Sequence, residues 1–266
     1  MKNVILVFTL SISFLSCNYK PVLKFDFDKD LNQRHVKELL SHKLIELNKN
    51  EGLNNSNAIK VSYVGYERGS RIIGRVFKLP EGLEEATLNY SVKFSKDFKF
   101  VKSGKLHGLI PNNKIVGGKK MQDDGWSVRA TFKAKGEIAT YIYYQNKPNK
   151  WGDGITTSHP VFTPGEYNDV AIYVKLNNPV SSNNGRCEIW VDGKLQISQD
   201  SIQYRKVPGD STLITHFLFN TFHGGHTPNY SPKNDKGEYT TEYAWFDNFE
   251  IYKGKYIKAY EGRTKE

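Results

Sequence analysis

The eight residues G125-W-S-V-R-A-T-F132 decide how the chain is expected to fold. Apolar side chains alternate strictly with polar ones along this stretch. The apolar set is Trp126, Val128, Ala130 and Phe132, and the polar set is Ser127, Arg129 and Thr131. A half-buried strand has this two-residue period. The sequence therefore predicts a strand with one face packed in a core and the other face free for chemistry.

The next stretch, A139-T-Y-I-Y-Y144, has the same period and places two tyrosines on one face. The intervening Ala134–Gly136 fits a three-residue hairpin loop with glycine in the left-handed position. Closure of the loop at Lys133 and Glu137 predicts the cross-strand pairs Arg129 with Tyr141 and Ser127 with Tyr143. A two-residue loop would shift the register by one residue and separate these pairs.

Alternating tyrosines are also common in ordinary solvated strands, because aromatic residues have high strand propensity. Two features favour a functional interpretation here. Arg129 and Ser127 lie in the paired strand, and the basic segment G104-K-L-H-G108 lies just upstream, with glycines flanking a lysine and a histidine. The polar groups are therefore expected to converge on one patch.

Three segments resemble motifs of polysaccharide lyase family 14. The family's G-K-L-P-G-L segment is similar to G104-K-L-H-G-L109, its G-W-S-x-R strand to G125-W-S-V-R129, and its Y-x-Y strand to Y141-I-Y143. Further similarity occurs in the expected strand at residues 88–100, in E188-I-W-V-D-G193 and in W245-F-D-N-F249, so the resemblance runs from about Asn57 to Tyr252. The sequence differs at His107, where the family usually has proline, and this imidazole could titrate near neutral pH.

The resemblance implies an all-β jelly roll, a concanavalin-like sandwich of two antiparallel sheets. It also implies a lyase that cleaves an acidic polyuronate by β-elimination without a cofactor; alginate is the first expectation, with glucuronan and ulvan as alternatives. By resemblance, Lys105 is the principal catalytic residue and Ser127 assists it. Arg129, Tyr141 and Tyr143 contact the substrate or transfer protons, and the residue that takes the proton stays open.

Elimination at a uronate makes three chemical demands. The carboxylate must be neutralised, the neighbouring C5 proton removed, and the departing O4 oxygen protonated. Arg129 suits the first role, because its guanidinium can hold a carboxylate through two hydrogen bonds and stays charged. Neighbouring cations are expected to favour the deprotonated forms of both lysine and tyrosine. His107 and His223 are reserve candidates for proton transfer and for contact with the substrate, although each could simply satisfy a loop hydrogen bond.

Composition favours one large β domain. The chain has 266 residues, of which 13% are aromatic and 22 are glycine, and many short alternating runs are separated by N-G, D-G and G-G turns. Such features are typical of a single-domain sandwich or jelly roll. A short N-terminal helix is expected only near residues 32–48, where Val36, Leu39, Leu40, Leu44 and Leu47 repeat at helical spacing, and it should cap the sandwich.

The N-terminus has the features of a targeting segment. Lys2 precedes a short apolar run that ends in F14-L-S-C17, which fits a bacterial lipoprotein signal at residues 1–16 with Cys17 as the lipidated residue. A simple cleaved signal or a short buried helix is the alternative. The expected order is then a tether at 17–22, the lyase domain at 23–257 and a tail at 258–266. The protein would be exported across the inner membrane and lipid-anchored, at the bacterial outer membrane or cell surface. Cys187 would be left as an unpaired, core-facing thiol.

The formal net charge of +10 indicates an anionic partner. Nucleic acid is set aside, because the basic residues are scattered and no nucleic-acid-binding motif is present. An acidic polysaccharide fits as the partner, and the protein is expected to bind it as a monomer. A lipoprotein that binds acidic glycans without cutting them is the alternative function.

Other kinds of site are set aside. His223 and His226, with Asp235 nearby in the sequence, could suggest a metal site, but the two histidines lack a convincing third ligand. The carboxylates Glu242, Asp247 and Glu250 do not keep the strand parity that a glycosidase pair needs. Loops at residues 111–124 and 223–236 are expected to set specificity.

Overall fold

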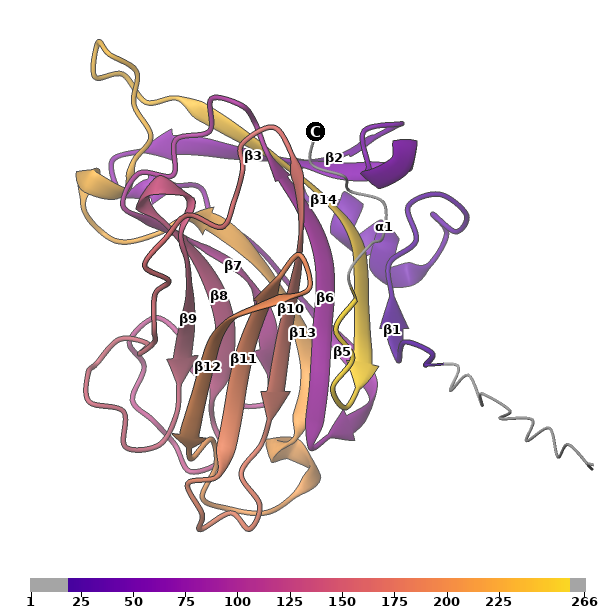
Figure 1. Cartoon of the computed structure of the whole chain (residues 1–266), viewed down its shortest axis with the longest axis vertical. Helices are drawn as coiled ribbons and strands as arrows, with labels where there is room; N and C mark the ends of the chain where they lie inside the picture. The colour runs from indigo at the N-terminus through magenta and orange to yellow at the C-terminus, as the bar shows by residue number, and fades with distance from the viewer. Residues whose placement is uncertain (1–18, 259–266) are drawn as a thin grey trace, which may run out of the picture.

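Two antiparallel sheets stacked face to face form the protein (Figure 1). The computed structural model describes residues 19–258, so the expected signal segment, Cys17 and residues 259–266 lie outside the described part. The larger sheet has the strand order β12-β11-β10-β6-β14-β3-β2, with β1 paired to β14 and β4 to β3. The smaller sheet has the order β5-β13-β7-β8-β9. The predicted jelly roll of two antiparallel sheets is confirmed.

The larger sheet consists of β1 (Leu23–Lys24), β2 (Ile45–Asn48), β3 (Ala58–Tyr66), β4 (Gly69–Ser70), β6 (Glu85–Phe94), β10 (Tyr167–Lys175), β11 (Gly185–Val191), β12 (Lys194–Ile202) and β14 (Thr241–Lys253). The smaller sheet consists of β5 (Ile73–Leu83), β7 (Ser103–Ile110), β8 (Ser127–Lys133), β9 (Ile138–Tyr143) and β13 (Ile214–His223). Short 3₁₀ turns lie at Leu53–Asn55, Ala134–Gly136, Asp210–Thr212 and Pro228–Tyr230.

The core between the sheets is built largely from aromatic rings. Phe132 of β8 packs against Phe94 of β6 with ring centroids 5.7 Å apart, and against Phe98 in the following loop at 5.6 Å. Trp126 is fully buried, and its indole nitrogen donates to the Thr212 carbonyl at 2.9 Å. Each such ring contributes about 1.5–3 kcal/mol on burial. The apolar face predicted for residues 125–132 is therefore part of the core.

The β8–β9 hairpin has the predicted register. The Lys133 amide donates to the Glu137 carbonyl at 2.8 Å, and Gly136 has a φ of 79°. Arg129 lies opposite Tyr141, and Ser127 lies opposite Tyr143. The three-residue loop thus brings the two strand motifs onto one face of the smaller sheet.

The helix is shorter than the sequence predicts. Helix α1 spans only Arg34–Leu40 and buries Val36 and Leu39, and it lies at one side of the sandwich near β1 (Figure 1). Residues 45–48 form β2, which pairs with β3, so the prediction of helix there was wrong. Pairing at the sheet edge satisfies the backbone of this segment and overrides its helical spacing. Likewise, the expected strand at residues 88–100 ends at Phe94.

Cys187 lies in β11 and its thiol is fully buried and free, as predicted. Burial raises the pKa of this thiol, which keeps it protonated and unreactive.

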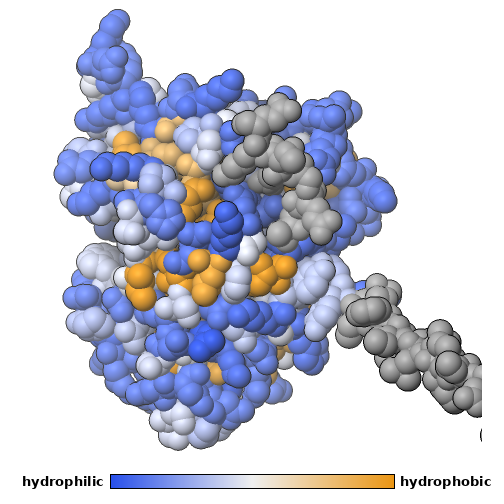
Figure 2. Space-filling view, viewed as in Figure 1, coloured by the Kyte–Doolittle hydropathy of each residue, from blue (hydrophilic) through white to orange (hydrophobic). Residues whose placement is uncertain are grey.

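The face of the molecule seen in Figure 2 is mainly hydrophilic, with hydrophobic residues gathered in a band across its middle. No helix within residues 19–258 is long and apolar enough to cross a membrane.

Candidate active site

A cavity of about 1060 Å³ lies on the outer side of the smaller sheet, beside Lys105 of β7, Arg129 of β8 and Tyr141 of β9. Typical sites for drug-sized ligands measure about 300–1,000 Å³, so this cavity has room for a longer ligand. Seven Lys and Arg side chains line it, against one carboxylate, Glu38. None of the seven forms an ion pair with a carboxylate of the described residues. The cavity therefore carries a large excess of uncompensated positive charge.

Two glycines of β7 shape the floor of the cavity. A side chain at Gly104 would overlap the Phe132 ring in the core, and a side chain at Gly108 would overlap the Val128 carbonyl and lie 2.8 Å from the Arg129 side chain. Both positions therefore require glycine for close approach rather than for a special backbone angle. The G-K-L-H-G segment lets β7 press against β8, which brings Lys105 beside Arg129.

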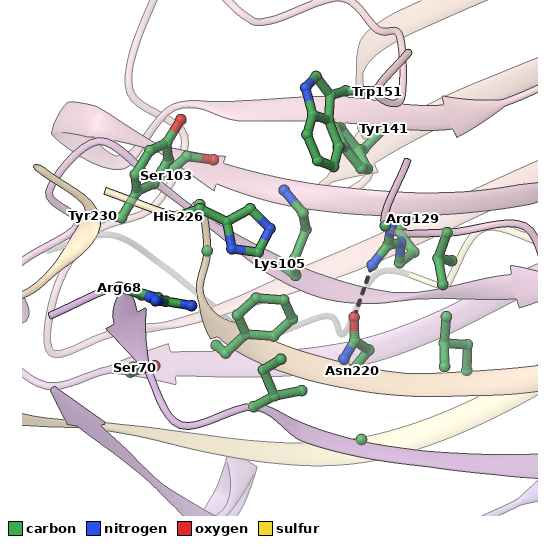
Figure 3. Close-up of a pocket in the computed structure, with 18 of the residues that line it drawn as sticks. Arg68, Ser70, Ser103, Lys105, Arg129, Tyr141, Trp151, Asn220, His226 and Tyr230 are labelled. Carbon is green, nitrogen blue, oxygen red and sulfur yellow. Dashed lines mark hydrogen bonds between the residues drawn. The ribbon is translucent and has the colours of Figure 1, made fainter. Parts of the chain in front are cut away.

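Lys105 is the cation of the cavity whose pKa is lowered into the neutral range. Its Nζ lies 3.9 Å from the Tyr141 ring centroid and has no carboxylate partner among residues 19–258. Burial, together with the smaller effects of the Arg129 and Lys133 charges, lowers the pKa of Lys105 to about 7. At neutral pH a substantial fraction of the amine is neutral, and a neutral amine can accept a proton. Figure 3 shows Lys105 reaching into the cavity between His226 and Tyr141.

Arg129 is a buried guanidinium that its surroundings satisfy only in part. Its Nη1 donates to Asn220 Oδ1 at 2.9 Å, and its Nε has no partner (Figure 3). Burial lowers the pKa of Arg129 to about 10, which leaves it charged at neutral pH. A buried cation without a counter-ion is costly to the fold. An anionic ligand in the cavity would offset this cost.

Tyr141 is half-buried and stays protonated. Burial raises its pKa to about 12, as does its hydrogen bond with Tyr143, whereas the Gly152 amide and the Arg129 charge act in the opposite direction. The Arg129 charge thus favours the deprotonated tyrosine, as expected, but burial outweighs it, so the expectation that Tyr141 moves toward use as a base was wrong. The expectation for Lys105 was right in direction, although burial is the larger cause there too. Lys105 and Tyr141 are thus an amine that gives up its proton readily and a phenol that retains its proton.

Ser127 and Tyr143 lie behind the cavity and do not line it. Both are fully buried under the loop that precedes β8. Ser127 Oγ donates to the Ile115 carbonyl at 2.6 Å, and the Tyr143 hydroxyl accepts the Gly118 amide at 2.9 Å. The prediction that the polar face of β8 is free was therefore wrong, because this loop covers part of it. Their catalytic roles stay predictions, and both are placed to hold the loop.

His107 and His223 point into the core, so the prediction that they contact substrate was wrong. Both side chains have no exposed surface. The register of β7 shifts between Lys105 and Gly108, which turns His107 inward instead of onto the face of Lys105. His107 Nδ1 accepts the Asn220 amide at 3.2 Å, and burial lowers its pKa well below the usual range. Burial likewise lowers the pKa of His223 to about 4.

Three residues around the cavity were not predicted from the sequence. Asn220 holds the Arg129 guanidinium, Trp151 lies over Tyr141 and the 116–118 segment, and Arg68 extends from the β3–β4 turn (Figure 3). They belong to segments far apart in the chain, and no local pattern marks them. Asn220 shares its face of β13 with Leu218 and Phe222, so the strand pattern gave no signal for it. Among the described residues, no group of three or more His, Cys, Asp or Glu side chains could hold a metal ion.

Comparison with known proteins agrees with the fold and the motifs. The family model for polysaccharide lyase 14 matches residues 55–249. The chain is a polysaccharide lyase by this match. It belongs to polysaccharide lyase family 14. No curated protein matches the sequence.

Several solved structures share the fold at low sequence identity. The alginate lyase of family 14 from Aplysia kurodai is 19% identical with a TM-score of 0.63, covering 88% of this chain and 99% of that chain. The endo-β-1,4-glucuronan lyase from Trichoderma reesei is 16% identical with a TM-score of 0.56, covering 80% and 88%. The alginate lyase Aly36B, in a mutant form with an alginate tetrasaccharide, is 20% identical with a TM-score of 0.62, covering 76% and 82%.

Proposed function

We propose that the protein cleaves a polyuronate by β-elimination at the cavity lined by Lys105, Arg129 and Tyr141, with alginate as the first substrate to test. The observation that carries this proposal is the buried Arg129 guanidinium, which has no carboxylate partner among residues 19–258 and whose Nε has no partner at all, next to a lysine whose pKa is about 7. The structures solved from related enzymes include alginate lyases and a glucuronan lyase, which supports this substrate class.

The proposed reaction divides three tasks among the three side chains. Arg129 binds the uronate carboxylate through the free part of its guanidinium and stabilises the negative charge that develops beside C5. The neutral amine of Lys105 removes the C5 proton. Tyr141 gives its proton to O4 as the C4–O4 bond breaks and a C4–C5 double bond forms. The proton count balances, because Lys105 ends as an ammonium and Tyr141 as a phenolate, and proton exchange with solvent restores both.

The pKa values of the two proton-transfer groups fit this division. A base and an acid working at the same pH need environments that push their pKa values apart. Burial lowers the pKa of Lys105 to about 7 and raises that of Tyr141 to about 12. Lys105 can therefore accept a proton at a pH where Tyr141 still has one to donate.

The test is the ultraviolet absorbance of the conjugated unsaturated uronate, followed during incubation with alginate, glucuronan and ulvan. The wild-type protein should produce this signal on at least one polymer. The Lys105→Ala variant should lose turnover while keeping much of its affinity. Lys194→Ala is the matched control, because it removes an exposed lysine from β12, outside the cavity. No signal on any polyuronate would refute the proposed function and leave glycan binding without cleavage.

A further inference from the structure

One end of the cavity is not used by the proposed chemistry. Arg68, Ser70, Ser103 and Tyr230 lie at this end in Figure 3, and Arg129 and Asn220 lie at the other, with Lys105 between them. Lys102 also lines the cavity, and its Nζ lies 5.1 Å from the Tyr230 ring centroid. We call Arg68, Lys102 and Tyr230 the distal cluster. It provides two cations and an aromatic ring, which are the groups that recognise a sugar acid.

The backbone that supports the distal cluster is tied together by hydrogen bonds. The Gly69 amide donates to Ser231 Oγ at 2.9 Å, and Ser231 Oγ also bonds the Tyr66 carbonyl. The Gly224 amide donates to the Ser103 carbonyl at 3.1 Å. These bonds join the β3–β4 turn, the start of β7 and the loop after β13. The end wall of the cavity is therefore preorganised, which reduces the cost of binding there.

The cations of the distal cluster have no counter-ion in the fold. Neither Arg68 nor Lys102 forms an ion pair with any carboxylate in residues 19–258. Both side chains are exposed toward solvent at this end. The positive charge is thus available to an anion that enters the cavity, and stacking against Tyr230 orients only the lysine.

The distance along β7 separates this cluster from the reaction centre. Lys102 precedes Lys105 by three residues and Gly108, the β7 residue opposite Arg129, by six, which corresponds to about 10 Å and about 20 Å along an extended chain. Between the two ends, Trp151 and His226 approach each other with ring centroids 5.9 Å apart. One carboxylate cannot reach both Arg129 and the distal cluster. A ligand that uses both ends must carry acid groups on at least two sugar units.

We propose that Arg68 and Lys102 form a second carboxylate subsite, with Tyr230 as its aromatic wall, so that the protein selects chains with uronates on both sides of the Trp151–His226 contact. This inference rests on the proposed function and extends it to substrate choice. Uronate homopolymers satisfy both ends. Chains whose uronates are isolated between neutral sugars fill only the Arg129 end.

The test compares R68Q, K102Q and the double variant R68Q/K102Q with the control K194Q, which removes one exposed positive charge outside the cavity and so matches each single variant. Each protein is assayed on mannuronate and glucuronate oligomers of graded length by ultraviolet absorbance. Loss of a charge-assisted contact should lower kcat/KM for long oligomers roughly ten- to a hundredfold more than for the shortest cleaved oligomer. The loss should fall mainly on KM, because the contact is equally strong before and during the reaction. K194Q should keep the wild-type ratio.

A second comparison uses alginate in which part of the carboxyl groups has been reduced to alcohols. Wild type should discriminate against this polymer, and R68Q/K102Q should discriminate less. Equal length dependence in R68Q/K102Q and K194Q, with wild type active, would overturn the second subsite and leave the proposed function standing. No turnover by wild type on any uronate would instead refute the proposed function. Far-ultraviolet circular dichroism confirms that each variant is folded.

Discussion

The pH dependence of cleavage should follow the protonation of Lys105. Its pKa of about 7 implies that about half of the amine is neutral at pH 7, about a tenth at pH 6 and about a hundredth at pH 5. If the neutral amine removes the C5 proton, kcat/KM should fall about tenfold per pH unit below 7. At the alkaline side, Arg129 loses its charge near its pKa of about 10, before Tyr141 titrates at about 12. The profile should therefore be a bell with limbs near pH 7 and pH 10.

The origin of the acidic limb can be tested by removing a neighbouring charge. Lys133 lowers the pKa of Lys105, so Lys133→Gln should raise this pKa and move the acidic limb to higher pH. Lys194→Gln removes the same charge from β12 and should leave the limb in place. Initial rates are measured by ultraviolet absorbance on a short oligomer at constant ionic strength, because salt screens these interactions. A flat profile between pH 5 and 8, or an acidic limb that moves to lower pH in Lys133→Gln, would refute the role of Lys105 as base.

Three further predictions concern stability and positioning. Below pH 7, Lys105→Met should be more stable than wild type by at most about 5 kcal/mol, because the wild-type fold must bury a charged lysine. This difference should shrink as the pH rises from 7 to 10.5, because in that range the lysine keeps its proton only in the unfolded state. Gly104→Ala should lower the free energy of unfolding by about 1–3 kcal/mol, because the added methyl group overlaps the Phe132 ring. Asn220→Ala should lower kcat/KM roughly ten- to a hundredfold, because the Arg129 guanidinium loses the acceptor that positions it.

Each of these predictions has a control. Thermal and denaturant unfolding of Lys105→Met at several pH values would contradict the linkage if the difference grew with pH. Gly74→Ala is the matched control for Gly104→Ala, since its methyl group would meet only ordinary contacts, the nearest at 3.4 Å. For Asn220→Ala, wild-type kcat/KM would show that the amide does not position Arg129. Asn220→Asp keeps an acceptor but adds a carboxylate beside the guanidinium, so it should also lose activity, because this carboxylate competes with the substrate for Arg129.

The local parts of the site could be predicted from the sequence. The pairs Arg129–Tyr141 and Ser127–Tyr143 depend only on two alternating strands and a three-residue loop. These features are encoded within about twenty neighbouring residues, and turn geometry fixes their register. The core-facing positions of Trp126 and Cys187 follow from the same two-residue period.

The non-local parts could not be predicted. The inward position of His107 results from a register shift between β7 and its neighbours, which strict alternation does not reveal. Asn220 reaches Arg129 only because β13 pairs with β7, a contact between segments more than 100 residues apart. The loop before β8 covers Ser127 and Tyr143, and its conformation does not follow from the strand pattern. Residues 45–48 form a strand because they pair with β3. All of these depend on packing between distant segments, which outweighs local preference.

The most direct test of the central claim is the mass of the products formed from alginate in water labelled with heavy oxygen. Elimination breaks the C4–O4 bond without adding water, so the new nonreducing ends should be unsaturated, lighter by one water molecule than a saturated end and free of the label. The Lys105→Ala variant should form almost none of these products. Saturated ends with label incorporated at the cleaved bond would show hydrolysis and would contradict the assignment of Lys105, Arg129 and Tyr141 to β-elimination.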